Sequence, residues 1–170
     1  MRKLISLLFL GAAACAAPTD ETGETATESA AVIAPAADVV RLRYEPQFVL
    51  EKVLEQKQRP FDAAKPFPAI KFASEITLTE FQDAIETQWG FRPDVITNAY
   101  SVVENTIYLM DDAAYYSQHG RCIDDSLAHE ITHYVQVVYQ GWTLEAADDS
   151  IEVDAVYMQR WFRQEYCGAS

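Results

Sequence analysis

Two histidines and a glutamate stand within five residues of one another, in the run His129-Glu130-Ile131-Thr132-His133. On a helix, residues four apart lie one above the other on the same face, so both imidazoles can reach a single metal ion. Glu130 lies beside them, where its carboxylate can accept a proton from a water molecule on that ion. An H-E-x-x-H run on a helix therefore predicts a zinc site that performs hydrolysis.

The flanking residues predict that this run is helical. We expect a helix from about Asp125 to Gln140, with its N-cap among Asp124, Asp125 and Ser126 and with Gly141 at its end. The alternative is a surface helix that carries two histidines by chance. A stripe of apolar residues at helical spacing lies on the face opposite the histidines, which favours a metal-binding helix packed on the core. The stripe consists of Leu127, Ile131, Tyr134, Val135 and Val138.

A third metal ligand has to come from the acidic residues after His133, which are Glu145, Asp148, Asp149, Glu152 and Asp154. Residues 150–162 predict a second helix, whose apolar stripe consists of Ile151, Ala155, Met158 and Phe162. Glu152 and Asp154 border opposite edges of this stripe, roughly 160° apart, so only one of them can face the metal. We favour Glu152, because its side chain is longer and the small Ala155 beside it lets the two helices approach. Asp154 remains the second candidate.

Residues 124–164 resemble the active-site helix pair of the zincin metallopeptidases, in the gluzincin branch, where a ligand glutamate on the next helix follows H-E-x-x-H. Glu152-Val153-Asp154-Ala155 resembles the E-x-x-A element of that branch. The metzincin pattern is not met, because Gln136 and Tyr139 stand where its glycine and final histidine would be. The chain is also similar to small bacterial zincin-like domains of uncharacterised function, on the residues 129–136 (H-E-x-x-H-x-x-Q) and 155–159 (A-x-Y-x-Q).

The resemblance implies an α+β, zincin-like fold in which a small sheet packs on the H-E-x-x-H helix and on a second, ligand-bearing helix. It implies Zn²⁺ held by His129, His133 and Glu152, with Glu130 as the general base. For a side chain that assists the oxyanion, we favour Tyr157, with His119 and Tyr134 as the other candidates. Four aspartates near the helix starts either orient the histidines or cap the helices: Asp124, Asp125, Asp148 and Asp149.

Residues 1–17 predict a signal peptide, with Arg2 and Lys3 before a short apolar run. Gly11 to Cys15 resembles a bacterial lipobox, which implies lipidation of Cys15; the alternative is ordinary cleavage at an A-x-A site around residues 14–16. Residues 18–40 predict a flexible acidic linker. We therefore expect an exported bacterial protein, periplasmic or an outer-membrane lipoprotein, that meets the membrane only through its N-terminal lipid.

Residues 41–170 are long enough for one domain. Patterns in its first half predict a helix over 46–58, a strand over 69–73, a helix that begins at a capping box over 79–82 and ends near Trp89 at Gly90, and a hairpin of strands 99–103 and 106–109. By the zincin resemblance, residues 106–110 would be the sheet edge that pairs with an extended substrate. The alternative is a plain core strand.

The remaining cysteines fit an oxidising compartment. Cys122 and Cys167 flank the two predicted ligand-bearing helices, so a disulfide between them would join the helices; the alternative is two free thiols. The net charge of −13 disfavours nucleic acid as a partner. The sequence thus predicts a zinc-dependent metallopeptidase with a peptide or protein substrate, and its alternative is a non-catalytic, surface-tethered binding or assembly protein with a zincin-like fold.

Overall fold

The computed structural model describes residues 38–145 and 148–168. The predicted signal peptide, the lipobox with Cys15 and most of the predicted linker lie outside these residues. The last part of that linker belongs to the fold, because Val39 forms an isolated β-bridge with Asp112 and the backbone N–H of Val40 donates to the carbonyl of Asp111. Across the described residues, no helix has both the length and the apolar character that a membrane crossing needs.

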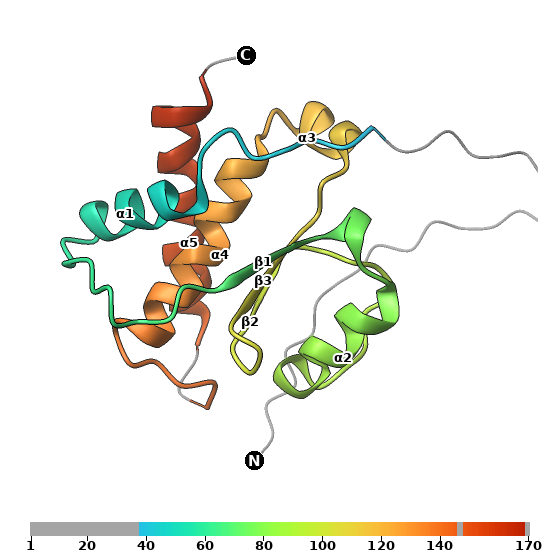
Figure 1. Ribbon diagram of the computed structural model, residues 1–170, viewed down its shortest axis with the longest axis horizontal. Helices are drawn as coiled ribbons and strands as arrows, with labels where there is room; N and C mark the ends of the chain where they lie inside the picture. Colours follow the sequence, from blue (N-terminus) through green and yellow to red (C-terminus); the bar gives the residue numbers. More distant parts are fainter. Residues whose placement is uncertain (1–37, 146–147, 169–170) are drawn as a thin grey trace, which may run out of the picture. The chain divides into compact units, whose positions relative to one another are not determined.

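Within the described residues, five α-helices and a three-stranded sheet form an α+β fold (Figure 1). The sheet consists of β1 (Ala69–Phe72), β2 (Ala99–Ser101) and β3 (Thr106–Leu109), in the order β1-β3-β2. The predicted hairpin of β2 and β3 is confirmed, and Asn105 in its turn has a positive φ of 47°. The predicted edge role of residues 106–110 is wrong. β1 pairs with β3 in parallel, from a distant part of the chain, so β3 is the central strand.

Alternation along β3 divides the core into two layers, because successive side chains of a strand point to opposite faces. Ile107 and Leu109 pack into the main cluster with α1 (Pro46–Gln56) and α4 (Ile123–Val138). Tyr108 packs on the other face, in the cluster that includes Phe81 and Ile85 of α2 (Leu78–Trp89). Figure 1 shows the sheet between α2 on one side and α1, α4 and α5 on the other.

The helix α2 begins with the type of capping box that was predicted, but two residues earlier. Thr77, and not Thr79, is the N-cap, since its side chain accepts a hydrogen bond from the backbone N–H of Glu80, whose carboxylate accepts from the N–H of Thr77. At the other end, Gly90 takes the left-handed conformation expected of a helix-stopping glycine, with φ of 75°.

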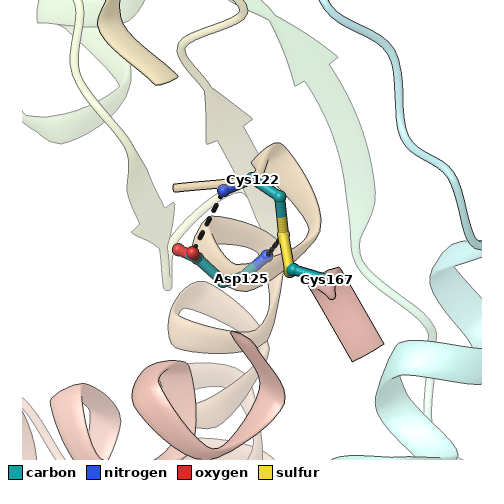
Figure 2. Close-up of side chains that lie close together, drawn as sticks. All are labelled: Cys122, Asp125 and Cys167. Atoms are coloured by element: carbon teal, nitrogen blue, oxygen red, sulfur yellow. Dashed lines mark hydrogen bonds between the residues drawn. A yellow bond between two sulfur atoms is a disulfide. The ribbon is translucent and has the colours of Figure 1, made fainter. Parts of the chain in front are cut away.

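The helix α4 begins at a cap that differs from the prediction. Cys122 is the N-cap: its sulfur accepts from the N–H of Asp125, and the Asp125 carboxylate accepts from the N–H of Cys122 (Figure 2). The candidates Asp124, Asp125 and Ser126 all lie inside the helix. Gly141 follows the helix with φ of 75°, as predicted. The apolar stripe is the core face, and Leu127, Ile131 and Val135 are fully buried.

The helix α5 (Asp149–Phe162) packs along α4 and begins at Asp148, which caps it through the N–H of Ser150. A disulfide joins Cys122 to Cys167, with the two Cα atoms 6.2 Å apart, as the sequence predicted. Three short helical segments were not predicted: η1 (Ala73–Glu75), α3 (Ala113–His119) and the π-helical turn η2 (Arg163–Cys167).

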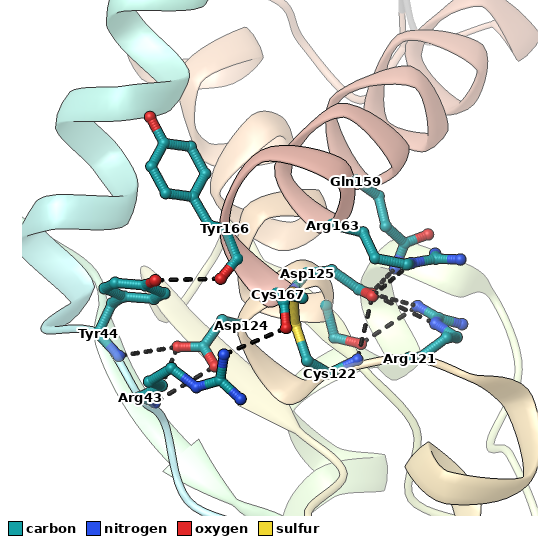
Figure 3. Close-up of a disulfide and its surroundings, with 11 residues drawn as sticks. Arg43, Tyr44, Arg121, Cys122, Asp124, Asp125, Gln159, Arg163, Tyr166 and Cys167 are labelled. Carbon is teal, nitrogen blue, oxygen red and sulfur yellow. Dashed lines mark hydrogen bonds and ion pairs between the residues drawn. A yellow bond between two sulfur atoms is a disulfide. The ribbon is translucent and has the colours of Figure 1, made fainter. Parts of the chain in front are cut away.

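Two buried aspartates hold the start of α4 in place (Figure 3). Asp125 is fully buried and accepts hydrogen bonds from the side chains of Arg121, Gln159 and Arg163. Asp124 accepts from the backbone N–H groups of residues 43 and 44. These carboxylates fasten α5 and the N-terminal segment to α4.

Candidate metal centre

The helix α4 presents both histidines to α5. Their side chains are 17% and 15% exposed, and the Nε2 atoms of His129 and His133 lie 3.1 Å apart. The i, i+4 spacing and the position of the apolar stripe produce this arrangement, since burying the stripe against α1 and the sheet turns the opposite face toward α5.

Glu152 is the acid that α5 brings to the histidines. Its two carboxylate oxygens lie 3.5 Å from Nε2 of His129 and 3.3 Å from Nε2 of His133. Its side chain is 62% exposed, so the centre opens to solvent on this side. Asp154 points elsewhere: it forms an ion pair with Lys57, at 2.6 Å, and accepts a hydrogen bond from Gln136.

His129, His133 and Glu152 lie near the separations that ligands of one zinc ion need. Zinc lies about 2.0–2.2 Å from nitrogen and oxygen ligands, and at a tetrahedral angle this places any two ligand atoms about 3.3 Å apart. The Nε2 atoms of the two histidines are 3.1 Å apart, and Glu152 lies 3.3 Å from Nε2 of His133 through Oε1 and 3.5 Å from Nε2 of His129 through Oε2. Three protein ligands leave a fourth position for water.

Glu130 lies next to this centre. One of its carboxylate oxygens is within 4.8 Å of a ring nitrogen of each histidine, and the residue is 5% exposed. Burial raises its pKa above the ordinary carboxyl value, while the neighbouring histidines and the backbone N–H of Tyr100 oppose that rise. A raised pKa brings a carboxyl group toward the range in which it can both accept and return a proton.

Electrostatic coupling links Glu152 to His129. Contact with His129 is the main cause that lowers the pKa of the Glu152 carboxyl. For His129, burial lowers the pKa, but Glu152 and Glu130 together raise it by more, so the net direction is upward. The two shifts together favour a charged Glu152 carboxylate paired with a protonated His129, and a metal ion in this place would have to displace that proton.

A cavity of about 210 Å³ opens beside the histidines. Its lining joins the two histidines and Glu152 to side chains of α2, of β2 with the residue after it, and of the loop after α4. The apolar ones include Trp89, Val102, Trp142 and Leu144, and the neutral polar ones are Gln88, Asn98, Gln136 and Thr143. Of the described residues that line it, none is lysine or arginine, and the acids are Glu130 and Glu152. The cavity is therefore mixed in polarity and carries negative charge.

The free edge of β2 also borders this cavity. The carbonyl of Tyr100 accepts a hydrogen bond from Nε2 of Gln88, and the N–H of Val102 donates to Oε1 of the same amide, both at 3.0 Å. Gln88 thus occupies backbone groups that a further strand would use.

The structure places the three candidate oxyanion partners in different surroundings. Tyr157 is 58% exposed; it does not line the cavity beside the histidines, but it lines an open surface hollow together with Glu152. The hydroxyl of Tyr134 donates to the carbonyl of Pro66 on the far side of α4. His119 ends α3, where its Nδ1 lies 2.7 Å from the carbonyl of Tyr115.

The aspartates considered as orienting groups make other bonds. Asp124, Asp125 and Asp148 bind backbone groups and side chains of the helix starts, and among the described hydrogen bonds none of them reaches a histidine. The group that contacts His133 is Gln136, whose Oε1 lies 2.9 Å from the Nδ1 of the ring. The sequence alone could have indicated Gln136, because it follows His133 by three residues, and residues three apart on a helix are neighbours on its surface.

A second group of metal-binding residue types lies at the start of α4, where Cys122, Asp125 and Cys167 have side-chain atoms within 4.8 Å of one another (Figure 2). Both sulfurs are joined in the disulfide, and the carboxylate is taken by arginine and glutamine side chains. This group is a structural clamp and not a metal centre.

No protein-family model, curated protein or solved structure matches the chain.

Proposed function

We propose that this protein is a zinc-dependent hydrolase of the metallopeptidase type. The observation that supports the proposal most strongly is that Nε2 of His129 and Nε2 of His133 lie 3.1 Å apart and that each lies within 3.3 to 3.5 Å of a carboxylate oxygen of Glu152, which suits a zinc ion with an open fourth position. The proposal includes the zincin-like, gluzincin-type arrangement of the two helices that the sequence resemblance implies.

Zinc in such a site supplies Lewis-acid polarisation of a carbonyl and lowers the pKa of water. The residues of the chain have separate tasks around it. His129, His133 and Glu152 bind and orient the ion. Glu130, buried beside them, accepts the proton of the attacking water and returns it to the leaving amine.

A peptide is the substrate class that the surroundings favour. The edge strand β2 runs along the cavity. The carbonyl of Tyr100 and the N–H of Val102, which bond to the Gln88 amide, can pair with an extended main chain once that side chain moves aside. Trp89, Trp142 and Leu144 in the lining favour an apolar side chain near the scissile bond, and the negative charge of the protein disfavours acidic peptides.

The disulfide supports the proposed location. Disulfides persist in oxidising compartments, so the bond between Cys122 and Cys167 agrees with export to the periplasm or to the outer membrane, in the latter case through a lipid at Cys15.

The proposal is tested with an unfolded protein as substrate and with two substitutions. The purified protein should cleave the substrate in a chelator-sensitive manner. Glu130→Gln should abolish cleavage and keep the bound zinc, because it removes the proton acceptor and no ligand. Glu152→Ala should lose zinc, whereas Asp154→Ala should still bind it, with a lower affinity because Gln136 loses one of its partners. Cleavage that survives both Glu130→Gln and chelation would overturn the proposal.

One observation favours a second candidate, a non-catalytic binding or assembly protein that uses the same site. Tyr134 and His119 make hydrogen bonds away from the centre, and Tyr157 lies in an outer hollow beside Glu152, so none of these candidates lines the cavity at the histidines. Under this alternative, the wild-type protein binds zinc and retains an unfolded polypeptide without cleaving it.

A further inference from the structure

Gln136 lies at the middle of a polar chain that crosses three helices. It is 3% exposed, and its side chain contacts both helices that carry the proposed ligands. Its Oε1 lies 2.9 Å from Nδ1 of His133 on α4. Its Nε2 lies 2.9 Å from the carbonyl oxygen of Ile151 and 2.8 Å from Oδ2 of Asp154, both on α5. Lys57, just after α1, donates to both oxygens of Asp154 at 2.6 and 2.8 Å.

These partners determine which way the amide of Gln136 faces. A backbone carbonyl only accepts hydrogen bonds, and a carboxylate paired with a lysine also only accepts. The amide NH₂ group must therefore face Ile151 and Asp154, because an oxygen in that place would meet two acceptors. The amide oxygen is left to face His133.

The orientation of the amide in turn determines the tautomer of His133. An amide oxygen accepts and does not donate, so the hydrogen bond at Nδ1 requires a proton on that nitrogen. In the neutral ring Nε2 then carries the lone pair, and Nε2 is the atom that faces Glu152 at 3.3 Å. A histidine binds zinc through such an unprotonated nitrogen.

We infer that Gln136 is a positioning residue, which holds His133 as the Nδ1–H tautomer with Nε2 toward the proposed metal and, through Ile151 and Asp154, fixes α5 so that Glu152 meets that nitrogen. The inference deepens the proposed function and rests on it for the identity of the ion. Asp154, the second candidate ligand from the sequence, becomes the group that orients Gln136.

The other histidine provides an internal comparison. Nδ1 of His129 is buried and, among the described residues, has no hydrogen-bond partner. No described group therefore holds a proton on Nδ1 of His129, whose other nitrogen, Nε2, faces Glu152 and His133, whereas Gln136 holds the proton on Nδ1 of His133.

Gln159 offers a matched control variant. It is also a buried glutamine, 8% exposed, that joins α4 to α5, but its Nε2 donates to Asp125 and it does not touch a histidine. A substitution of Gln159 loosens the contact between the helices without changing the hydrogen bond at His133.

The test compares the wild-type protein with Gln136→Met and Gln159→Met, which remove the amide and keep an unbranched side chain of similar size. Two readouts are needed, both independent of hydrolysis. Nitrogen NMR of the zinc-free protein, recorded at a pH at which the spectra show both rings to be neutral, reports the tautomer of each ring. Titration of zinc against a competing chelator reports the affinity.

We expect the Nδ1–H tautomer at His133 in the wild type and in Gln159→Met, and a mixture of tautomers in Gln136→Met. Zinc affinity should fall about 10- to 100-fold in Gln136→Met and stay near the wild-type value in Gln159→Met. An Nε2–H tautomer at His133 in the wild type overturns the inference, even where a variant fails to fold. Equal losses of zinc affinity in the two variants also overturn it, because they indicate a purely structural role.

These outcomes separate the inference from the proposed function. A wild-type protein that binds zinc with the expected tautomer and cleaves nothing supports the role of Gln136 and counts against the hydrolase. A wild-type protein with the expected tautomer and no affinity for zinc supports the positioning of His133 and defeats the zinc site itself.

Discussion

Removal of the disulfide should lower the free energy of unfolding by an amount that follows from the length of the loop it closes. Cys122 and Cys167 are 45 residues apart in the sequence, and a cross-link that closes a loop of this length lowers the entropy of the unfolded chain. The chain-entropy relation for such a loop gives about 4 kcal/mol at 25 °C. The perturbation is the double variant Cys122→Ser and Cys167→Ser. Serine is a good N-cap, so the start of α4 keeps a side-chain acceptor and the loss reflects the cross-link.

Equilibrium unfolding in urea is the assay. With a slope of about 2 kcal/mol per molar urea, a loss of about 4 kcal/mol lowers the midpoint by about 2 M. The wild-type protein treated with a reductant should shift by a similar amount, which serves as the control for the two substitutions. A midpoint that moves by less than about 0.5 M in both the double variant and the reduced wild type refutes the reasoning.

Four further results are expected. Thr77→Ala should lower the unfolding free energy by about 1 kcal/mol through loss of the α2 cap, while Thr77→Ser keeps it, as measured by thermal unfolding; equal stability of the alanine variant would argue against the cap. Asp125→Ala should cost about 3–5 kcal/mol in urea unfolding, because it leaves Arg121 and Arg163 without their buried partner; a loss under 1 kcal/mol would show that water replaces the carboxylate. Zinc affinity should fall as the pH drops through the raised pKa of His129, since protons then compete with zinc; affinity that is equal at about pH 5.5 and 7.5 would contradict the histidine ligands. Gln88→Ala should lower the KM for an unfolded protein substrate several-fold, about 1 kcal/mol, by freeing the β2 edge; an unchanged KM would place the peptide elsewhere.

Local patterns along the chain were enough to predict most elements of the fold. The 3.6-residue spacing of the stripe through Leu127 and Ile131 specified α4, and it also placed the histidines on the opposite face. Alternation and a turn at Asn105 specified the hairpin. These features depend on neighbours within a few residues, so the sequence alone carries them.

Features that depend on distant segments could not be predicted. The strand β3 is central because β1, some 35 residues earlier, pairs with it, and nothing in β3 itself indicates which of its sides is paired. Similarly, the helical wheel of α5 left Glu152 and Asp154 as alternatives for the third metal ligand. Lys57 draws Asp154 away from the histidines, and that contact joins residues 97 positions apart.

The start of α4 shows how one residue type can mislead. Asp124 and Asp125 are good N-cap residues by type, yet both are buried inside the helix and Cys122 is the cap. The carboxylate of Asp125 accepts a hydrogen bond from the N–H of Cys122, as the N3 residue of a capping box does. Asp125 therefore takes part in the cap from position N3, while Cys122 is the N-cap residue.

We propose that His129, His133 and Glu152 hold one zinc ion. The most direct test is the zinc content of the purified protein after dialysis without chelator, measured beside Glu152→Ala. We predict about one zinc per molecule in the wild type and a strong loss in the variant. A wild-type content near zero that added zinc does not restore would contradict the account, as would a full zinc content in Glu152→Ala.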